Sequence, residues 1–240
     1  MDTQNSVYAS MRRFWVVWLF LPFVAAAQQP AKPAHPPAQP AGPPTQQHQP
    51  AEHFENGSVA MPDERAADSY AIYSMLVPGP VLQNMPPGQT QSWAIADTTI
   101  STEDRSPSVP PQGQLKPPPG KEKLFEEAIG DFEANQHVRI HLTRNGFHLD
   151  HAFTLLAPDQ VQQLRDAKTS PAVPSSMQTQ WGGYPGVTFF SEVYFDKKHT
   201  AALVYQSEWC AHLCSAGTWI YLEKQGNRWV RQSGNVVPGA

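Results

Sequence analysis

Two cysteines, Cys210 and Cys214, are the only ones in the chain, and His212 lies between them. Thiolate sulfur and imidazole nitrogen are ligands for zinc and copper, whereas two neighbouring thiols can also act as a redox pair or form a structural disulfide. The compartment decides between these chemistries, because disulfides persist outside the cytosol and are rare inside it.

The first 27 residues predict that the chain is exported. Arg12 and Arg13 precede an apolar run of 14 residues, Phe14 to Ala27, which ends in alanines. This layout is typical of a secretory signal peptide cleaved near Ala27. A retained membrane anchor is the alternative, but a span needs about 20 apolar residues and Pro22 interrupts this run. We therefore expect a periplasmic or secreted protein with no transmembrane helix in the mature chain.

For an exported protein, a disulfide between Cys210 and Cys214 requires the fewest assumptions. If this segment were extended, its two end Cα atoms would lie about 13 Å apart, beyond the ~7 Å limit for a disulfide. The chain therefore has to turn back, and the small residues after Cys214 favour a turn. Two alternatives stay open. A metal site of Cys210, His212 and Cys214 lacks an identified fourth ligand, and a redox pair would favour the shorter C-x-x-C spacing.

A second candidate site lies in residues 137–151, which hold four of the nine histidines. Apolar and polar residues alternate on both sides of Asn145-Gly146, a dipeptide typical of a two-residue hairpin turn. In the register that this turn sets, His141 lies opposite Asp150, with His148 as a near neighbour.

Two interpretations fit this cluster. His141, His148 and Asp150 could hold a zinc ion with an open coordination position, which would make the protein a metal-dependent hydrolase. Alternatively, the three residues belong to a solvated sheet face, on which opposite charges commonly pair across strands. The sequence has no recognisable nucleophile elbow, phosphate loop or pair of catalytic carboxylates, which favours a non-catalytic protein without a cofactor.

Composition separates a spacer from a folded domain. Residues 28–50 hold eight of the 25 prolines and otherwise small or polar residues, so we expect a disordered Pro/Ala/Gln-rich spacer over residues 28–59. Residues 60–238 are long enough for a single domain, with a Pro-rich loop near residues 106–120. Without residues 1–27 the chain carries 15 basic and 20 acidic side chains, a net charge of −5. This balance argues against nucleic acid as a partner.

Apolar periodicity predicts an α+β fold. Two segments have the spacing of amphipathic helices, residues 61–77 and 121–136, and a short helix that begins at Pro158 is expected over residues 158–167. Residues 91–100 alternate as a strand does. Four further β-rich runs are separated by short turn sequences: residues 187–195, 201–209, 218–224 and 228–232. We expect these to form a C-terminal antiparallel meander of four strands, with helices packed on one face of an antiparallel sheet. In the first run, alternation places Glu192 on the face away from Val193.

The C-terminal region carries a series of short motifs. They are F-S-x-V-x-F, A-L-V-Y, C-x-x-L-C-x-x-G and an L-E-K run followed by glycine and tryptophan. The chain matches them at Phe190, Ser191, Val193 and Phe195, at Ala202 to Tyr205, at Cys210, Leu213, Cys214 and Gly217, and at Leu222 to Lys224, Gly226 and Trp229. This region resembles that of a group of uncharacterised exported bacterial proteins, in which a small residue usually stands where this chain has His212. The resemblance implies a shared exported domain and no particular activity.

Two function classes follow. The first is an exported non-catalytic domain on a proline-rich spacer, which binds an unidentified envelope or extracellular partner or a small ligand. Trp181, Tyr184 and Trp209 are its candidate contacts, although aromatic residues near strands are commonly part of the core. The second is the metal-dependent hydrolase that uses the histidine cluster.

Overall fold

A computed structural model describes residues 54, 56–77, 92–104, 107, 110–210 and 215–232 of the chain. These residues belong to one compact unit that spans residues 49–240. The predicted signal peptide, most of the predicted spacer, His212 and Cys214 lie outside the described residues. Within the described ranges, none of the helices is both long and apolar enough to span a bilayer.

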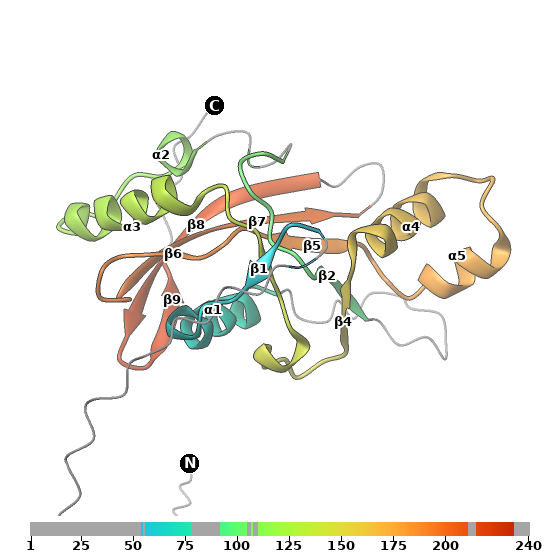
Figure 1. Ribbon diagram of the computed structural model, residues 1–240, viewed down its shortest axis with the longest axis horizontal. Coiled ribbons are helices and arrows are strands. Elements are labelled where there is room, and N and C mark those ends of the chain that lie inside the picture. The colour runs from blue at the N-terminus through green and yellow to red at the C-terminus, as the bar shows by residue number, and fades with distance from the viewer. Residues whose placement is uncertain are drawn as a thin grey trace, which may run out of the picture. The chain divides into compact units, whose positions relative to one another are not determined.

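The described residues form both helices and strands, which confirms the predicted α+β class (Figure 1). In chain order the elements are β1 (Val59–Ala60), α1 (Asp63–Leu76), β2 (Trp93–Ala96), α2 (Pro111–Gln114), α3 (Glu122–Asn135), β3 (Ile140–His141), the 3₁₀ helix η1 (Arg144–Gly146), β4 (Phe153–Leu156), α4 (Pro158–Thr169), α5 (Ser175–Trp181), β5 (Val187–Phe190), β6 (Tyr194–Phe195), β7 (Ala201–Trp209), β8 (Ser215–Gln225) and β9 (Arg228–Arg231).

One large sheet organises the fold, with strand order β4-β2-β5-β7-β8-β9 and β6 paired to β7. Strands β5, β7, β8 and β9 are antiparallel neighbours, which confirms the predicted four-stranded meander. Strands β2, β4 and β5 run parallel, so the sheet is mixed and not antiparallel throughout as we expected. The chain between β4 and β5 contains α4 and α5, which is long enough for the crossover that parallel strands require.

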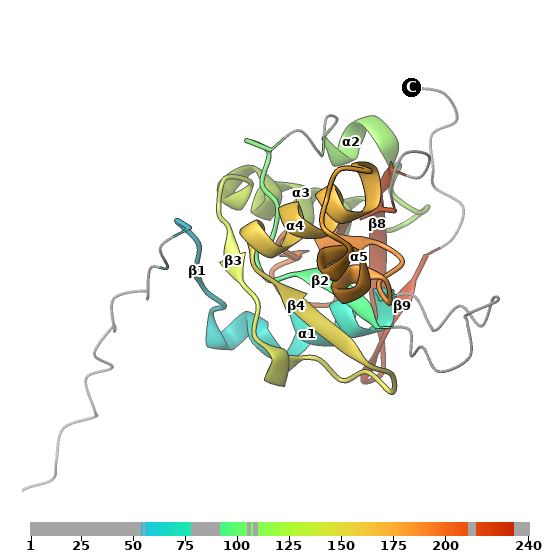
Figure 2. The ribbon, with the colours of Figure 1, turned by 90° about the vertical axis from the view of Figure 1, so that its right-hand side faces the viewer.

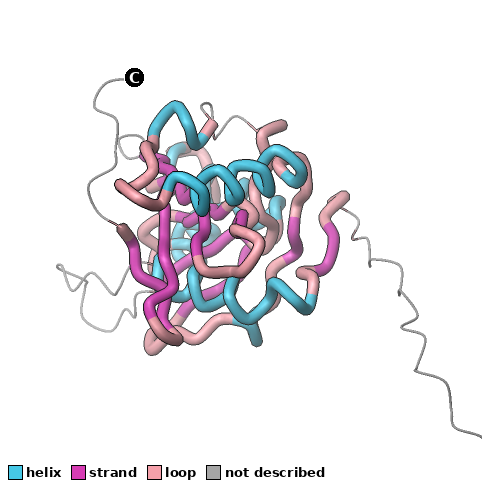
Figure 3. The backbone as a smooth tube through the Cα atoms, turned by 90° about the vertical axis from the view of Figure 1, so that its left-hand side faces the viewer, coloured by secondary structure: helices cyan, strands magenta, loops and turns pink. Residues whose placement is uncertain are grey.

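Helices cover both faces of this sheet, whereas the sequence predicted helices on one face only. Along β7, Ala202 and Val204 pack in the core that includes residues of α1, and Leu203 and Tyr205 pack in the core that includes residues of α3. A third core joins α4 and α5 to β2 on the face opposite α1. Figure 2 views this arrangement from the end that carries α4 and α5, and Figure 3 shows strands with helices on either side.

Local sequence explains the two helices that matter most for the site. In α3, Phe125, Ala128, Ile129 and Phe132 are buried, as the apolar spacing predicted, and this stripe turns the charged face of the helix outward. The first turn of α1 carries acidic side chains, which favour a helix N-terminus. A proline pair begins directly after Val77, where the helix has ended.

The hairpin predicted at Asn145-Gly146 is wrong. Residues Arg144–Gly146 form η1, β3 pairs in parallel with β1, and β4 pairs in parallel with β2. Gly146 serves packing instead: a Cβ atom built there would overlap the ring of Tyr70 in α1. The Tyr70 hydroxyl also accepts the backbone N–H of Thr143 at 2.8 Å. Long-range contact with α1 therefore overrides the local turn signal.

Candidate functional site

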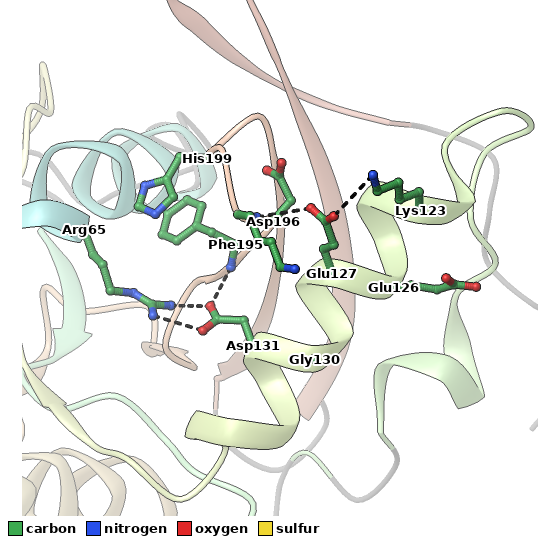
Figure 4. Close-up of a pocket in the computed structure, with 10 residues that line it drawn as sticks. Arg65, Lys123, Glu126, Glu127, Gly130, Asp131, Phe195, Asp196 and His199 are labelled. Atoms are coloured by element: carbon green, nitrogen blue, oxygen red, sulfur yellow. Dashed lines mark hydrogen bonds and ion pairs between the residues drawn. The ribbon is translucent and has the colours of Figure 1, made fainter.

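A pocket of 610 Å³ opens where the first turn of α1, the charged face of α3 and the β6–β7 turn meet (Figure 4). We call it the α1–α3 pocket. Its lining residues are mostly charged: Arg65, Lys123, Glu126, Glu127, Gly130, Asp131, Phe195, Asp196, Lys197 and His199.

Arg65 joins the three walls of the pocket. Its guanidinium donates to both carboxylate oxygens of Asp131, at 3.2 and 2.7 Å, and to the carbonyl of Val193. Asp131 also accepts the backbone N–H of Phe195 at 2.7 Å and the side-chain amide of Asn135 at 2.8 Å. Figure 4 shows Asp131 joined by dashed lines to the guanidinium of Arg65 and to the backbone nitrogen of Phe195. Both oxygens of Asp131 are thus engaged, and this carboxylate holds α1, α3 and β6 together.

Glu192 lies behind Arg65 and is only 3% exposed. One of its oxygens is 3.3 Å from the guanidinium, and the other, Oε2, has no hydrogen-bond partner among the described residues. Burial raises the pKa of Glu192 to about 7, since the attraction of Arg65 only partly offsets it and the charge of Asp131 adds to it. Burial by itself lowers the pKa of Arg65, but its bond to Asp131 and the charges of both carboxylates raise it overall.

Sequence alternation placed Glu192 on the strand face away from Val193, but the predicted run 187–195 is not one continuous strand, and both residues are buried. Strand β5 ends at Phe190 and β6 begins only at Tyr194. Between them, the carbonyl of Ser191 accepts the hydroxyl of Tyr73 at 2.9 Å. The irregular segment turns Glu192 inward, toward Arg65.

The β6–β7 turn forms a firm wall of the pocket. The buried carboxylate of Asp196 accepts the backbone N–H groups of Lys198, Thr200 and Ala201. The His199 ring stacks on the Phe195 ring with centroids 4.4 Å apart. These contacts anchor the turn that carries the exposed Lys197 side chain.

Gly130 forms an open part of the pocket on α3. It is exposed, lies in the interior of the helix, and a Cβ atom added to it would meet no atom within 4 Å in the described chain. A glycine inside a helix costs about 0.5–1 kcal/mol relative to alanine. No contact within the described part of the protein requires this glycine, so its effect is to leave the helix backbone accessible from the pocket.

Charges of both signs remain available to a bound molecule. The described lining contains three basic residues and four acidic residues, apart from His199. Arg65, Asp131 and Asp196 are engaged within the protein, as shown above. Glu127 accepts the backbone N–H of Lys197 at 3.4 Å, which leaves the side chains of Lys123, Lys197 and Glu126. Lys123 and Glu127 are 4.0 Å apart, a weak surface pair. The pocket can therefore offer ammonium groups and carboxylates together.

The predicted histidine cluster does not assemble, because its hairpin is absent. His141 lies in β3, where it pairs with Ala60, and its ring stacks on Phe54 at 4.2 Å. His148 is exposed, and its backbone N–H donates to the hydroxyl of Ser74 at 3.0 Å.

Asp150, the third predicted ligand, points into solvent with its side chain 97% exposed. It lies 3.0 Å from Nδ1 of His151, and a hydrogen bond with this neighbour lowers the pKa of Asp150. Across the described ranges, no three His, Cys, Asp or Glu side chains group closely enough to hold a metal ion. His141, His148 and Asp150 are all described, so the structure does not bring them together as a metal site.

The cysteine and aromatic predictions have mixed outcomes. Cys214 lies outside the described residues, so its bridge to Cys210 stays a prediction. Trp209 pairs with Ser215 across β7 and β8, so the chain does turn back between these residues, as a disulfide requires.

Trp181 is 4% exposed and belongs to the core, which is incompatible with a surface contact. Tyr184 and Trp209 are partly buried and pack against the same core.

Comparison of the chain with protein-family models, curated proteins and solved structures gave no match. Sequence analysis did not predict the α1–α3 pocket, because residues that line it, such as Arg65 and Asp131, are far apart in the chain. One local signal could have drawn attention to it: Gly130, a glycine inside an amphipathic helix.

Proposed function

We propose that the protein is an exported, non-catalytic binding protein whose α1–α3 pocket holds a small zwitterionic ligand, such as an amino acid or a short peptide. Export is supported by the signal-like sequence of residues 1–27 and by the resemblance of the C-terminal motifs to exported proteins. The pocket geometry supports the binding function.

The observation that carries the proposal is the open glycine on α3. Glycine allows a ligand to approach a backbone closely, and Gly130 is placed where only solvent or a ligand could use that space. Alanine would form a more stable helix at this position. A function in binding gives the glycine a reason that internal packing does not.

The charges favour a ligand that is itself both positive and negative. Lys123 and Lys197 can receive a carboxylate, and Glu126 can receive an ammonium group, with the partly engaged Glu127 beside it in the lining. A phosphate-rich ligand would meet the two glutamates and a polyamine would meet the two lysines, so neither class matches the pocket as a whole.

The position of Glu192 argues for binding and against catalysis in the α1–α3 pocket. Its pKa of about 7 is suited to proton transfer. However, the described lining of the pocket does not include Glu192, which lies behind Arg65. The acids that do line the pocket either hold the fold together or lie at its surface.

Titration calorimetry of the purified mature protein tests the proposal. The probes are glycylglycine, glutamate and lysine, compared with acetate and methylamine, which each carry one charge only. We expect saturable binding of at least one zwitterionic probe, at least about tenfold tighter than either singly charged probe. Equal affinity for acetate or methylamine, or no binding of any zwitterion at millimolar concentration, would contradict the proposal.

Two substitutions locate the binding in the pocket. G130L fills the open space and is expected to weaken binding about tenfold or more, while the loss of a helical glycine raises the stability of the fold. The control A71L places the same leucine side chain at an exposed position of α1 outside the pocket lining. It is expected to leave the affinity unchanged. Equal affinity of the wild type and G130L would show that the ligand binds outside this pocket.

A further inference from the structure

A second, smaller cavity of 240 Å³ lies at the carboxyl ends of the parallel strands β2 and β4. Ala96 and Leu156, the last residues of the two strands, both line it, as does Pro158 at the start of α4. We call it the β2–β4 cavity. In open sheets with parallel strands, ligands commonly bind outside the carboxyl ends of the strands.

Arg165 of α4 lines this cavity and is held by aromatic rings. Its guanidinium carbon lies 5.3 Å from the ring centroid of Phe189 and 5.5 Å from that of Trp209. Its Nε is buried without a hydrogen-bond partner in the part of the chain that the structure describes. Burial lowers the pKa of Arg165.

The other charged groups of the cavity have partners within the protein. Arg139 pairs with Asp104 at 3.1 Å, and Asp104 also accepts the backbone N–H of Ser101 at 2.8 Å. Asp97 accepts the hydroxyl of Thr98 at 2.8 Å. Arg165 is therefore the basic group of this lining whose side-chain donors form no hydrogen bond with the described residues.

We propose that the β2–β4 cavity binds the carboxylate of a small monocarboxylate ligand, with the guanidinium of Arg165 as its anchor. A guanidinium presents parallel N–H donors that match a carboxylate in a bidentate pair. The rings of Phe189 and Trp209 hold the planar guanidinium against the protein. Because this side chain is already ordered, binding a carboxylate costs less conformational entropy.

The size and charge of the cavity define the ligand further. A volume of 240 Å³ suits a molecule of a few carbon atoms. Asp97 and Asp104 also line the cavity, so a dianion such as phosphate is repelled more strongly than a monoanion. This site is separate from the α1–α3 pocket, and its test does not depend on the function proposed there.

Nuclear magnetic resonance of the full mature chain tests this proposal with propionate as the probe. We expect the Nε–Hε resonance of Arg165 to shift in a saturable manner, and inorganic phosphate to bind at least about tenfold more weakly. R165Q is expected to weaken propionate binding by about 10- to 100-fold, the value of a charge-assisted hydrogen bond. R165K keeps the charge without the planar fork and is expected to show an intermediate loss.

The control R228Q removes an exposed arginine on β9 and should leave binding unchanged. Thermal unfolding of each variant establishes that the fold is retained. Shifts that do not saturate, propionate affinity that is the same in R165Q as in the wild type, or equal affinity for phosphate would each overturn the proposal.

Discussion

Neutralising Glu192 should make the protein more stable above neutral pH. The pKa of this carboxyl rises from 4.5 to about 7 on folding, chiefly because the group is buried. Each pKa unit corresponds to about 1.4 kcal/mol, so ionisation of Glu192 in the folded protein costs about 3 kcal/mol. E192Q keeps the shape of the protonated side chain and removes this cost.

The sign of the pH dependence follows from which state binds the proton more tightly. Between pH 4.5 and about 7 the folded state holds a proton on Glu192 that the unfolded state releases. The contribution of this group to stability is therefore greatest below pH 4.5, falls as the pH rises toward 7, and is lowest above it.

Urea unfolding of the wild type and E192Q at pH 5 and pH 8 measures this effect. The stability difference in favour of E192Q is expected to grow by about 2–3 kcal/mol between the two pH values. The control E133Q removes an exposed carboxylate from α3 and should change stability by less than about 0.5 kcal/mol. A difference that does not change with pH, or an E192Q protein less stable than the wild type at pH 8, would show that Arg65 outweighs burial.

Three further predictions follow from the contacts described above. R65A leaves two acidic partners without their shared cation and should destabilise the fold by about 3 kcal/mol in urea unfolding; a loss below about 1 kcal/mol would contradict the bridging role. G146A should lower stability by about 1–3 kcal/mol, because the added methyl group overlaps the ring of Tyr70; an unchanged melting temperature would be inconsistent with that packing. Thiol titration of native exported protein should find no reactive thiol, and reducing the bridge between Cys210 and Cys214 should lower stability by only about 2 kcal/mol. Two reactive thiols would refute the bridge.

Side-chain patterns between neighbouring residues correctly predicted α3 and the strands of the meander. The apolar stripe of α3 and the four strands of the meander follow from side-chain spacing and short connections, which are properties of neighbouring residues. The same reasoning failed at Asn145-Gly146. There the glycine is required by the approach of Tyr70, a residue far away in the sequence.

The candidate site depends on contacts that side-chain spacing does not encode. Arg65 and Asp131 meet across 66 residues of chain, and Glu192 joins them only because the strand is interrupted after Phe190. The parallel half of the sheet also depends on a crossover through α4 and α5. The sequence analysis assumed antiparallel pairing throughout the sheet and therefore missed the parallel pairing of β2 with β4 and β5.

Mapping the binding of glycylglycine on the mature protein by backbone amide resonances tests the central claim most directly. If the α1–α3 pocket is the binding site, saturable shifts should cluster at Gly130 on α3 and at Lys197 and His199 in the β6–β7 turn, and the affinity that they report should fall about tenfold or more in G130L. Shifts that cluster elsewhere, or that report the same affinity in G130L as in the wild type, would contradict the account.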